Sequence, residues 1–534
     1  MNQAETKRRQ VQAIATILAL INLSVIARLT GYNGVTYVAV GLETYAIIYA
    51  AVSGGAADAL ARLLRLRNAK GQYRNAARIR RNVLLFQLAL GVAGTAVALI
   101  AAEGIAEKLF RVQYSSFILT ILAPAVFLRS VSEVLLGYSR GRGEELPTAV
   151  VSILRQVFTL GFSLLFCRML GNYGSKVSRL LVQENFASMY GGVGVAIAVT
   201  LSEVFVIIFL ILMYKGSRHS AEKASQEGIR TTVSFPESVK LLCANRGAKV
   251  GIQLLAMLSL PLGFIFLQKA SGGSNDIAVE YGVYAAGYGV ICGIMVAMIM
   301  VMAIPIYSRA AGLIRREEHR FARTVFQSGV HIIVVHAGFM TVFLGVMAGQ
   351  AAAVMCSGQT ETAEKMFCGG SSVILFAALS LYFSRMLILT GKKYFVMVAL
   401  AAADVVYAVT VTVSLNTGKT GILSLIYGGV AGSAVLCIVL GTLTYRQLRQ
   451  RVDWLQVLIV PVAAACVAGL LGMLLGKVLT PHVGNLISLL VCLVISGALY
   501  WAGLLLLRNF REQELEVIPG GRFINALGQM LHVL

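Results

Sequence analysis

The chain has 534 residues, of which 57% are hydrophobic and only 13% are charged, and its formal net charge is +22. A soluble protein carries charge on roughly a quarter of its residues, so this composition excludes an ordinary water-soluble fold and indicates a membrane protein. The positive charge does not indicate nucleic acid as a partner, because the basic residues gather in alternate loops between apolar segments.

Apolar segments follow one another along the chain, and each is long enough for a helix to cross a hydrocarbon core of about 30 Å. They are too long and too continuously apolar for the strands of a membrane β-barrel. The sequence therefore predicts an all-α polytopic membrane protein with fourteen transmembrane helices. The predicted spans are residues 11–30, 35–56, 82–102, 115–138, 148–170, 188–213, 247–267, 282–306, 327–351, 369–390, 393–414, 421–443, 455–477 and 483–507.

The basic loops predict the orientation of the chain. Loops rich in lysine and arginine stay in the cytoplasm, so we expect both termini there, with the basic side chains against anionic lipid headgroups. The first apolar segment follows the basic run KRR but lacks a small-residue cleavage site, so we interpret it as a retained helix. The basic clusters are residues 7–9, 62–81, 215–249, 309–323, 392–393, 446–451 and 508–522.

Two loops of the first half resemble two loops of the second half. Residues 61–86 and 308–330 are both basic, and their YRNAAR and HRFAR segments align; residues 137–150 and 389–398 are both short basic turns into a helix. The offset is six helices, and an even number keeps both copies in the same orientation, which predicts two lobes related by an axis along the membrane normal. The predicted domains are an N-lobe at 1–215, a C-lobe at 216–452, two extra helices at 453–507 and a cytoplasmic amphipathic tail at 508–534.

Charged residues inside the predicted spans are the candidate functional residues. At 1.5 Å per residue, Glu43, Arg129 and Arg155 lie roughly 12–14 Å inside the bilayer, and Glu203, His336 and Asp404 lie nearest the midplane. A charge there costs at least about 2.5 kcal/mol unless it is paired or hydrated, which predicts a polar interior. Arg28 and Arg385 lie near helix ends, where a long stem can snorkel to the headgroups.

The intramembrane charges separate into two predicted groups. Arg129 and Glu133 are four residues apart on one helix face, and Arg155 enters from the adjoining helix at a matching depth. These three residues could form a structural cluster or contact the substrate directly, and the sequence leaves both roles open. We predict Arg129, Arg155, Glu43 and Glu133 as the substrate-binding set. Glu203, Asp404 and His336 are the predicted sites for a coupling cation or proton; for His336 the alternative is a buried neutral histidine.

The motifs of soluble enzymes are missing from the sequence. There is no GxxxxGK[ST] phosphate loop, no HExxH and no GxSxG, so we expect a protein that is not an enzyme, uses no cofactor and draws energy from an ion gradient, a membrane potential or its substrate. The eight cysteines form no CxxC pair, so no metal site is predicted. Cys356 and Cys368 lie near the outer ends of two helices, and the sequence is compatible either with a disulfide between them or with two free thiols.

Three segments resemble the bacterial polysaccharide flippases of the MOP superfamily, in the stage V sporulation protein B and lipid II flippase branch. In residues 27–64 the matching positions are Ala27, Arg28, Gly31, Gly34 and Tyr37. In residues 135–157 they are Gly137, Tyr138, Gly141 and Pro147, which fit the family's GYFQG turn and the proline that opens helix 5. Residues 511–534 are similar to the family's acidic segment, proline and final amphipathic helix.

The resemblance implies alternating access by two lobes, with an undecaprenyl-linked sugar headgroup as cargo and basic cavity residues that meet the lipid's diphosphate. It also implies a bacterial cytoplasmic membrane. The chain departs from the family at several points: helix 1 lacks the family's R-x-x-G, Leu136 replaces an arginine and Arg155 replaces a glutamate, while Arg129, Glu133 and Glu43 have no recognised counterpart.

The preferred function is therefore transport of a polyprenyl-linked glycan from the inner to the outer leaflet. A cation-coupled multidrug antiporter of the related MATE branch is the first alternative, although such antiporters usually have twelve helices. The second alternative is a scaffold of a glycan-assembly complex that transports nothing, which would have little reason to keep charges at the midplane.

Overall fold

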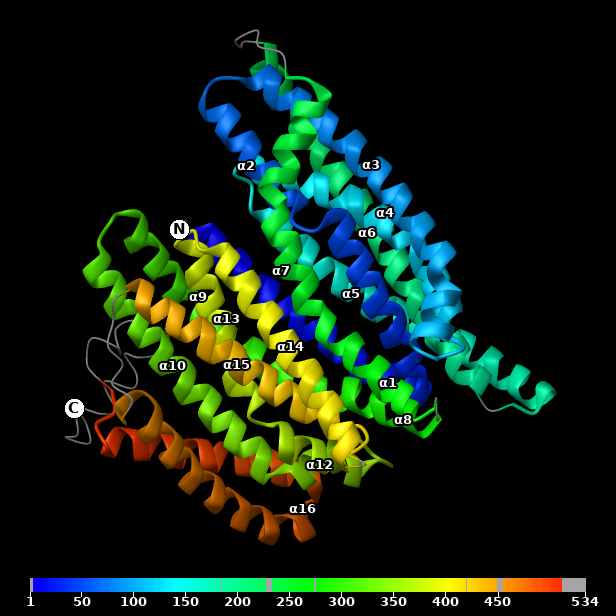
Figure 1. Cartoon of the computed structure of the whole chain (residues 1–534), viewed down its shortest axis with the longest axis vertical. Helices are drawn as coiled ribbons and strands as arrows, with labels where there is room; N and C mark the ends of the chain where they lie inside the picture. The colour runs from blue at the N-terminus through cyan, green and yellow to red at the C-terminus, as the bar shows by residue number, and fades with distance from the viewer. Residues whose placement is uncertain are drawn as a thin grey trace. The chain divides into compact units, whose positions relative to one another are not determined.

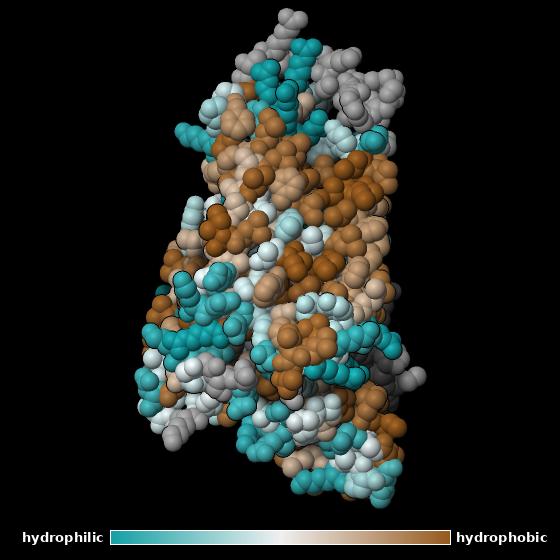
Figure 2. All heavy atoms as spheres, turned by 90° about the vertical axis from the view of Figure 1, so that its right-hand side faces the viewer, coloured by the Kyte–Doolittle hydropathy of each residue, from teal (hydrophilic) through white to brown (hydrophobic). Residues whose placement is uncertain are grey.

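The computed structural model describes residues 3–183, 185–226, 233–272, 275–418, 420–448 and 455–510. Within these ranges the regular structure is entirely helical. Apolar side chains cover long stretches of the helix surfaces between groups of polar side chains (Figure 2), as expected for helices that are surrounded by lipid. The chain is thus a multi-pass integral membrane protein. The predicted tail helix begins at 508, and its part beyond 510 lies outside the described residues.

The helices that are long and apolar enough to cross a membrane confirm the predicted number of fourteen transmembrane spans. Among the described residues eleven helices qualify, or twelve when the bent pair Thr360–Gly370 and Val373–Leu389 counts as one span. Two of the twelve contain a break at a glycine in the left-handed region, Gly31 (φ 73°) in the first and Gly484 (φ 78°) in the last. Because only glycine adopts this conformation without strain, each glycine divides one long helix into two spans, which gives fourteen.

The chain forms two compact units, and each is described by itself. The N-terminal unit comprises residues 21–282, and the C-terminal unit comprises residues 1–20 and 283–534. Their limits differ from the predicted lobes, because the first residues of the chain belong to the C-terminal unit and residues 235–270 belong to the N-terminal unit. The relation of the two lobes by a pseudo-two-fold axis stays a prediction.

The N-terminal unit is built mainly from long helices. They are the part of α1 (Gln3–Ser53) after residue 20, α2 (Ala56–Ala69), α3 (Tyr73–Glu103), η1 (Gly104–Leu109), α4 (Ser115–Gly141), α5 (Leu146–Leu181), α6 (Asn185–Gln226), α7 (Phe235–Ala270) and α8 (Asn275–Val283).

Short polar contacts fasten α7 to the N-terminal unit. Asp58 on α2 accepts a hydrogen bond from Arg140 on α4 over 2.5 Å and forms an ion pair with Lys249 on α7. Arg246 on α7 donates to the backbone carbonyls of Ala51 and Val52 over 2.9 Å each. These side chains explain why α7 packs with residues 21–282, which a count of spans could not show.

The C-terminal unit contains the first residues of α1, η2 (Tyr284–Tyr288), α9 (Gly289–Arg315), α10 (His319–Val346), α11 (Ala348–Met355), α12 (Thr360–Gly370), α13 (Val373–Leu389), α14 (Lys393–Gly418), α15 (Leu423–Leu448), η3 (Leu455–Ile459) and α16 (Val460–Leu506). Within it α9, α10, α13 and α15 pack side by side, α14 packs on α15, and α16 packs on α10 (Figure 1).

Candidate functional site

A cluster of charged side chains joins three helices of the N-terminal unit. Glu203 on α6 lies at its centre with only 1% of its side chain exposed. Arg129 on α4 donates from Nη1 to Glu203 Oε1 over 2.7 Å. Arg155 on α5 places Nε 2.6 Å from the same oxygen and donates from Nη2 to Oε2 over 3.2 Å. One buried carboxylate therefore holds two arginines from two neighbouring helices.

Glu133 and an aromatic side chain complete the cluster. Glu133 lies one helical turn after Arg129, with 3.8 Å between its Oε1 and Arg129 Nε. Tyr49 on α1 donates to Glu133 Oε1 over 3.0 Å, and the Arg129 guanidinium lies 4.9 Å from the centre of the Tyr49 ring. The cluster thus joins α1, α4, α5 and α6.

Local packing explains why these side chains meet. One turn after Arg155, Thr159 donates to Ser202, the residue beside Glu203, over 3.0 Å. Gly194 on α6 lies against the backbone of α5, where a Cβ atom would be 2.7 Å from the amide nitrogen of Cys167. This close approach packs α6 directly against α5. The predicted cluster of Arg129, Glu133 and Arg155 is formed, and Glu203 is its main acceptor.

The charges of the cluster balance. Two guanidinium groups face the two carboxylates of Glu133 and Glu203, all four side chains are at most 21% exposed, and both arginines are engaged by Glu203. Unpaired charges would be costly at this depth, whereas pairing them fixes the helices that carry them. The arrangement gives Arg129 and Arg155 a positioning role, and their predicted contact with substrate stays a prediction.

Glu43 bonds to a tyrosine on a helix that is distant in the sequence. Its Oε1 accepts a hydrogen bond of 2.5 Å from the hydroxyl of Tyr281 on α8, and its predicted contact with substrate stays a prediction. The partners are 238 positions apart in the chain. The bond ties α1 to α8, together with the bond of 2.5 Å from Thr36 to the Ala278 carbonyl.

Replacing Tyr281 by phenylalanine should lower the free energy of unfolding by about 1–3 kcal/mol, because it leaves a buried carboxyl group without its donor. Denaturation of the detergent-solubilised protein measures this effect. Tyr394→Phe is the control, since Tyr394 is 61% exposed, and it should leave the stability unchanged. Equal stability of both variants would show that the contact contributes nothing.

The three predicted coupling residues do not come together. Glu203 belongs to the arginine cluster of the N-terminal unit, whereas His336 on α10 and Asp404 on α14 belong to the C-terminal unit. His336 Nδ1 lies 2.8 Å from the Ile332 carbonyl oxygen, and its ring contacts Trp501. Asp404 is partly buried, and its Oδ2 has no hydrogen-bond partner among the described residues. The roles of these residues in coupling stay predictions.

None of the eight cysteines forms a disulfide in this structure, Cys356 and Cys368 included. Within the described ranges no group of three or more histidine, cysteine, aspartate or glutamate side chains could hold a metal ion.

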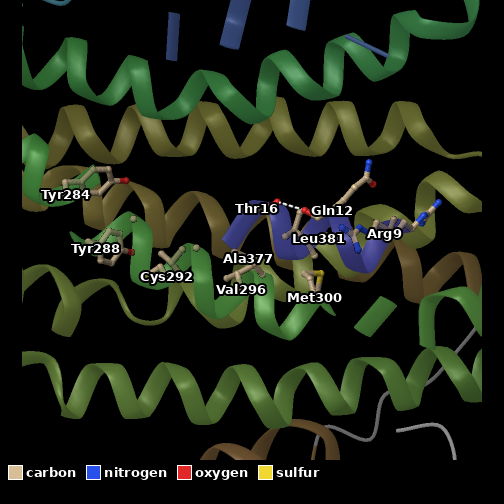
Figure 3. Close-up of a pocket in the computed structure, with 16 residues that line it drawn as sticks. Arg9, Gln12, Thr16, Tyr284, Tyr288, Cys292, Val296, Met300, Ala377 and Leu381 are labelled. Carbon is tan, nitrogen blue, oxygen red and sulfur yellow. Dashed lines mark hydrogen bonds between the residues drawn. The ribbon is translucent and has the colours of Figure 1, made fainter. Parts of the chain in front are cut away.

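The C-terminal unit contains a cavity of about 460 Å³. Arg9, Gln12, Ala13 and Thr16 line it from one face of α1, and residues of η2, α9 and α13 form the other walls. Arg9 lies at one end and Tyr284 and Tyr288 at the other, with Val296, Ala377 and Met300 between them (Figure 3). Arg385 on α13 is the second arginine in the lining.

Comparison with known proteins identifies the fold. No family model matches the chain. An inward-facing multidrug-resistance MATE-family transporter of the MOP superfamily superposes on 84% of this chain and 98% of its own, with a TM-score of 0.61 and 15% identity. A MOP-superfamily transporter from Pyrococcus furiosus Vc1 (DSM3638) gives the same coverage with a TM-score of 0.60 and 15% identity.

The chain is a membrane protein with the fold of the MOP-superfamily transporters. Stage V sporulation protein B of Bacillus subtilis (strain 168) is 20% identical in an alignment of 537 positions that covers 95% of this chain and 95% of that protein. The predicted resemblance to this superfamily is confirmed.

The arginines that line the cavity were not among the predicted site residues. Arg9 stands in the basic run KRR, which we interpreted as an orientation signal, and Arg385 near a helix end was interpreted as a snorkelling residue. The spacing of Arg9, Gln12 and Thr16 is the available signal, because residues three and four apart share one helix face.

Proposed function

We propose that this MOP-superfamily transporter flips a polyprenyl-linked glycan from the inner to the outer leaflet of a bacterial cytoplasmic membrane, with both termini in the cytoplasm. The observation that carries the proposal is how much of this chain is covered by its sequence relative and how much by the solved transporters. The alignment with stage V sporulation protein B covers 95% of this chain. The superpositions on three solved MATE-fold transporters cover only 84% of this chain, although they cover 94–99% of the transporters' own lengths. This chain is therefore longer than the antiporter fold requires.

The helix pair in α16 fits the additional function of holding a lipid tail. Small residues let its two halves and α10 pack closely. A Cβ atom on Gly472 would lie 2.3 Å from Ser496 Oγ of the other half, and one on Gly469 would lie 2.8 Å from Val342 of α10. Its other face presents large apolar side chains that are more than half exposed, namely Val467, Leu470, Leu474, Val478, Leu486, Ile487, Leu490 and Val494. A polyprenyl chain would find an apolar surface there.

The polarity of the cavity also favours an anionic cargo over a cationic drug. Among the described residues the cavity is lined by two arginines and by none of the acidic side chains that would attract a cation. The description of the Pyrococcus furiosus transporter states that the reversed polarity of its binding pocket suggests a different function. By the same physical reasoning, a basic pocket in this fold favours a phosphate-bearing lipid.

Binding of a photoreactive polyprenyl diphosphate glycan to the purified full chain tests the proposal. We expect cross-linking that an unlabelled polyprenyl diphosphate glycan abolishes and that a lipophilic cationic drug leaves unchanged. Competition by the cation alone would favour the MATE-like antiporter, and absence of cross-linking would contradict the flippase. A scaffold that transports nothing could still bind the lipid, so transport itself is measured separately.

A further inference from the structure

The hairpin formed by α5 and α6 extends beyond the membrane-crossing part of the N-terminal unit. Gly174 on α5 packs against Ala187 and Tyr190 of α6, where the predicted span 188–213 begins. From residue 174 to residue 181, its last residue, α5 advances about 10 Å along its axis. The lipid headgroups reach only about 5–8 Å beyond the hydrocarbon core. The end of the hairpin therefore clears the headgroups, and it projects past the ends of α3 and α4 (Figure 1).

A single serine fixes the turn at the end of the hairpin. The Ser178 carbonyl accepts hydrogen bonds from the backbone amide of Val182 and, over 3.1 Å, from that of Gln183. The Ser178 hydroxyl accepts a hydrogen bond of 3.2 Å from the Ala187 amide on α6. The turn is thus held from both helices, and the side chains that it carries have fixed directions.

Val182 adopts a backbone conformation that is unfavourable for its side chain. Its φ of 53° and ψ of 39° lie in the left-handed region, where helices usually end on glycine or asparagine. Among the described residues other than glycine with positive φ, Val182 alone is β-branched, which makes the conformation strained. Glycine would relieve this strain. A valine that is strained and yet 90% exposed indicates that its side chain serves an interaction and not the fold.

Val182 continues an exposed apolar run. Leu180 and Leu181 precede it, with 82% and 57% of their surfaces exposed. Exposed apolar side chains are ordinary where a helix faces lipid, but a consecutive run of them beyond the headgroups is not covered by lipid. Such a run is typical of a surface that binds another molecule.

Basic side chains border the apolar run. Lys176 and Arg179 lie within one turn before it, are exposed and make no hydrogen bond or ion pair among the described residues. Residues 168–188 contain three basic residues and one acidic residue, Glu184, which lies outside the described residues. In the proposed orientation this is an external loop, where lysine and arginine are disfavoured as orientation signals. The positive charge therefore favours an acidic binding partner.

We propose that residues 176–182 form a docking surface for a second protein, one whose apolar pocket is bordered by carboxylates. Leu180 and Val182 would enter the pocket, and Lys176 and Arg179 would pair with the carboxylates around it. A second copy of this chain fits poorly, because two hairpins would bring like charges together. The docking surface rests on the hairpin alone, whereas its place on the outer side of the membrane rests on the proposed function.

Fluorescence anisotropy with the full chain in lipid nanodiscs tests the surface, with two helical peptides as probes. Both peptides carry leucines along one face, which glutamates flank in the first and lysines flank in the second. We expect the glutamate peptide to bind and the lysine peptide not to bind. Arg179→Glu and Val182→Gly should each weaken binding of the glutamate peptide at least tenfold.

Two matched variants control for charge and for shape. Lys269→Glu reverses an exposed charge on α7, away from the hairpin, and Val182→Ile keeps the apolar β-branched side chain. Both should leave the dissociation constant unchanged. Thermal melting separates binding from folding: Val182→Gly should melt at or above the parent temperature, because it relieves strain, although it loses the peptide.

Three results would overturn the docking surface and leave the flippase proposal intact. The first is a glutamate peptide that does not bind the parent chain, and the second is one that binds the Arg179→Glu and Val182→Gly proteins as tightly as the parent. The third is quenching of a fluorescent amino acid at position 182 by nitroxide-labelled lipid, which would show that the end of the hairpin inserts into the bilayer.

Discussion

Replacing Glu203 by glutamine is expected to lower the free energy of unfolding by about 3–5 kcal/mol, because removal of one partner leaves buried charges without compensation. Glu203 accepts hydrogen bonds or ion pairs from both Arg129 and Arg155 at distances of 2.6–3.2 Å. Glutamine has the same shape but carries no charge, so two guanidinium groups would share the carboxylate of Glu133 alone. Denaturation of the detergent-solubilised protein measures the loss.

A double variant and an exposed control make this result specific. Glu203→Gln with Arg155→Gln leaves Arg129 beside Glu133 with balanced charge, so it should recover part of the lost stability. Glu361→Gln removes a carboxylate that is 84% exposed and pairs with Lys365, and it should change the stability by less than about 0.5 kcal/mol. A Glu203→Gln protein as stable as the parent would contradict the structural role of the cluster.

Substitution of Gly194 by leucine is expected to be about as damaging, with a loss of about 3 kcal/mol or more. A Cβ atom there would lie 2.7 Å from the backbone carbonyl carbon of Phe166 and 2.8 Å from its oxygen. A backbone cannot move aside as a flexible side chain can, so α5 and α6 would separate. Membrane helices associate largely through such close packing of small residues, and the Glu203 contacts would open with them.

Gly161→Leu is the matched control for Gly194→Leu. Gly161 lies on α5, and no atom lies within 4 Å of the Cβ that the substitution would add. The control should fold, elute as a monodisperse peak in size-exclusion chromatography and melt at the parent temperature. Identical melting of the Gly194→Leu protein would show that α5 and α6 can separate without cost.

The spans could be predicted from the sequence because burial in lipid imposes a simple physical rule. A segment that crosses the membrane must be long, apolar and helical, since no water is available for its backbone groups. The break at Gly31 lies between two predicted spans for the same reason, because a loop between two spans needs a residue that can leave the helix. The break at Gly484 falls at the second residue of the last predicted span, 483–507. The packing of α7 with the N-terminal unit depends on the ion pair between Asp58 and Lys249, which no local sequence pattern shows.

The candidate site could be predicted where its residues share a helix or lie at matching depths on helices that adjoin in the sequence, as Arg155 does. Arg129 and Glu133 are four positions apart, so their pairing follows from helix geometry. Glu203 was assigned to ion coupling because the sequence shows its depth and not the direction in which α6 presents it. Glu43 and Tyr281 meet across 238 positions, and that pairing depends on packing alone.

The leaflet distribution of a labelled lipid tests the central claim most directly. Full-length protein is reconstituted into vesicles with a fluorescent polyprenyl diphosphate glycan, and a membrane-impermeant reagent quenches the label that faces outside. A flippase should make nearly all of the label accessible within minutes, whereas empty vesicles should keep the inner share protected. An inner share that stays protected with folded, lipid-binding protein would contradict transport of a polyprenyl-linked glycan by this chain.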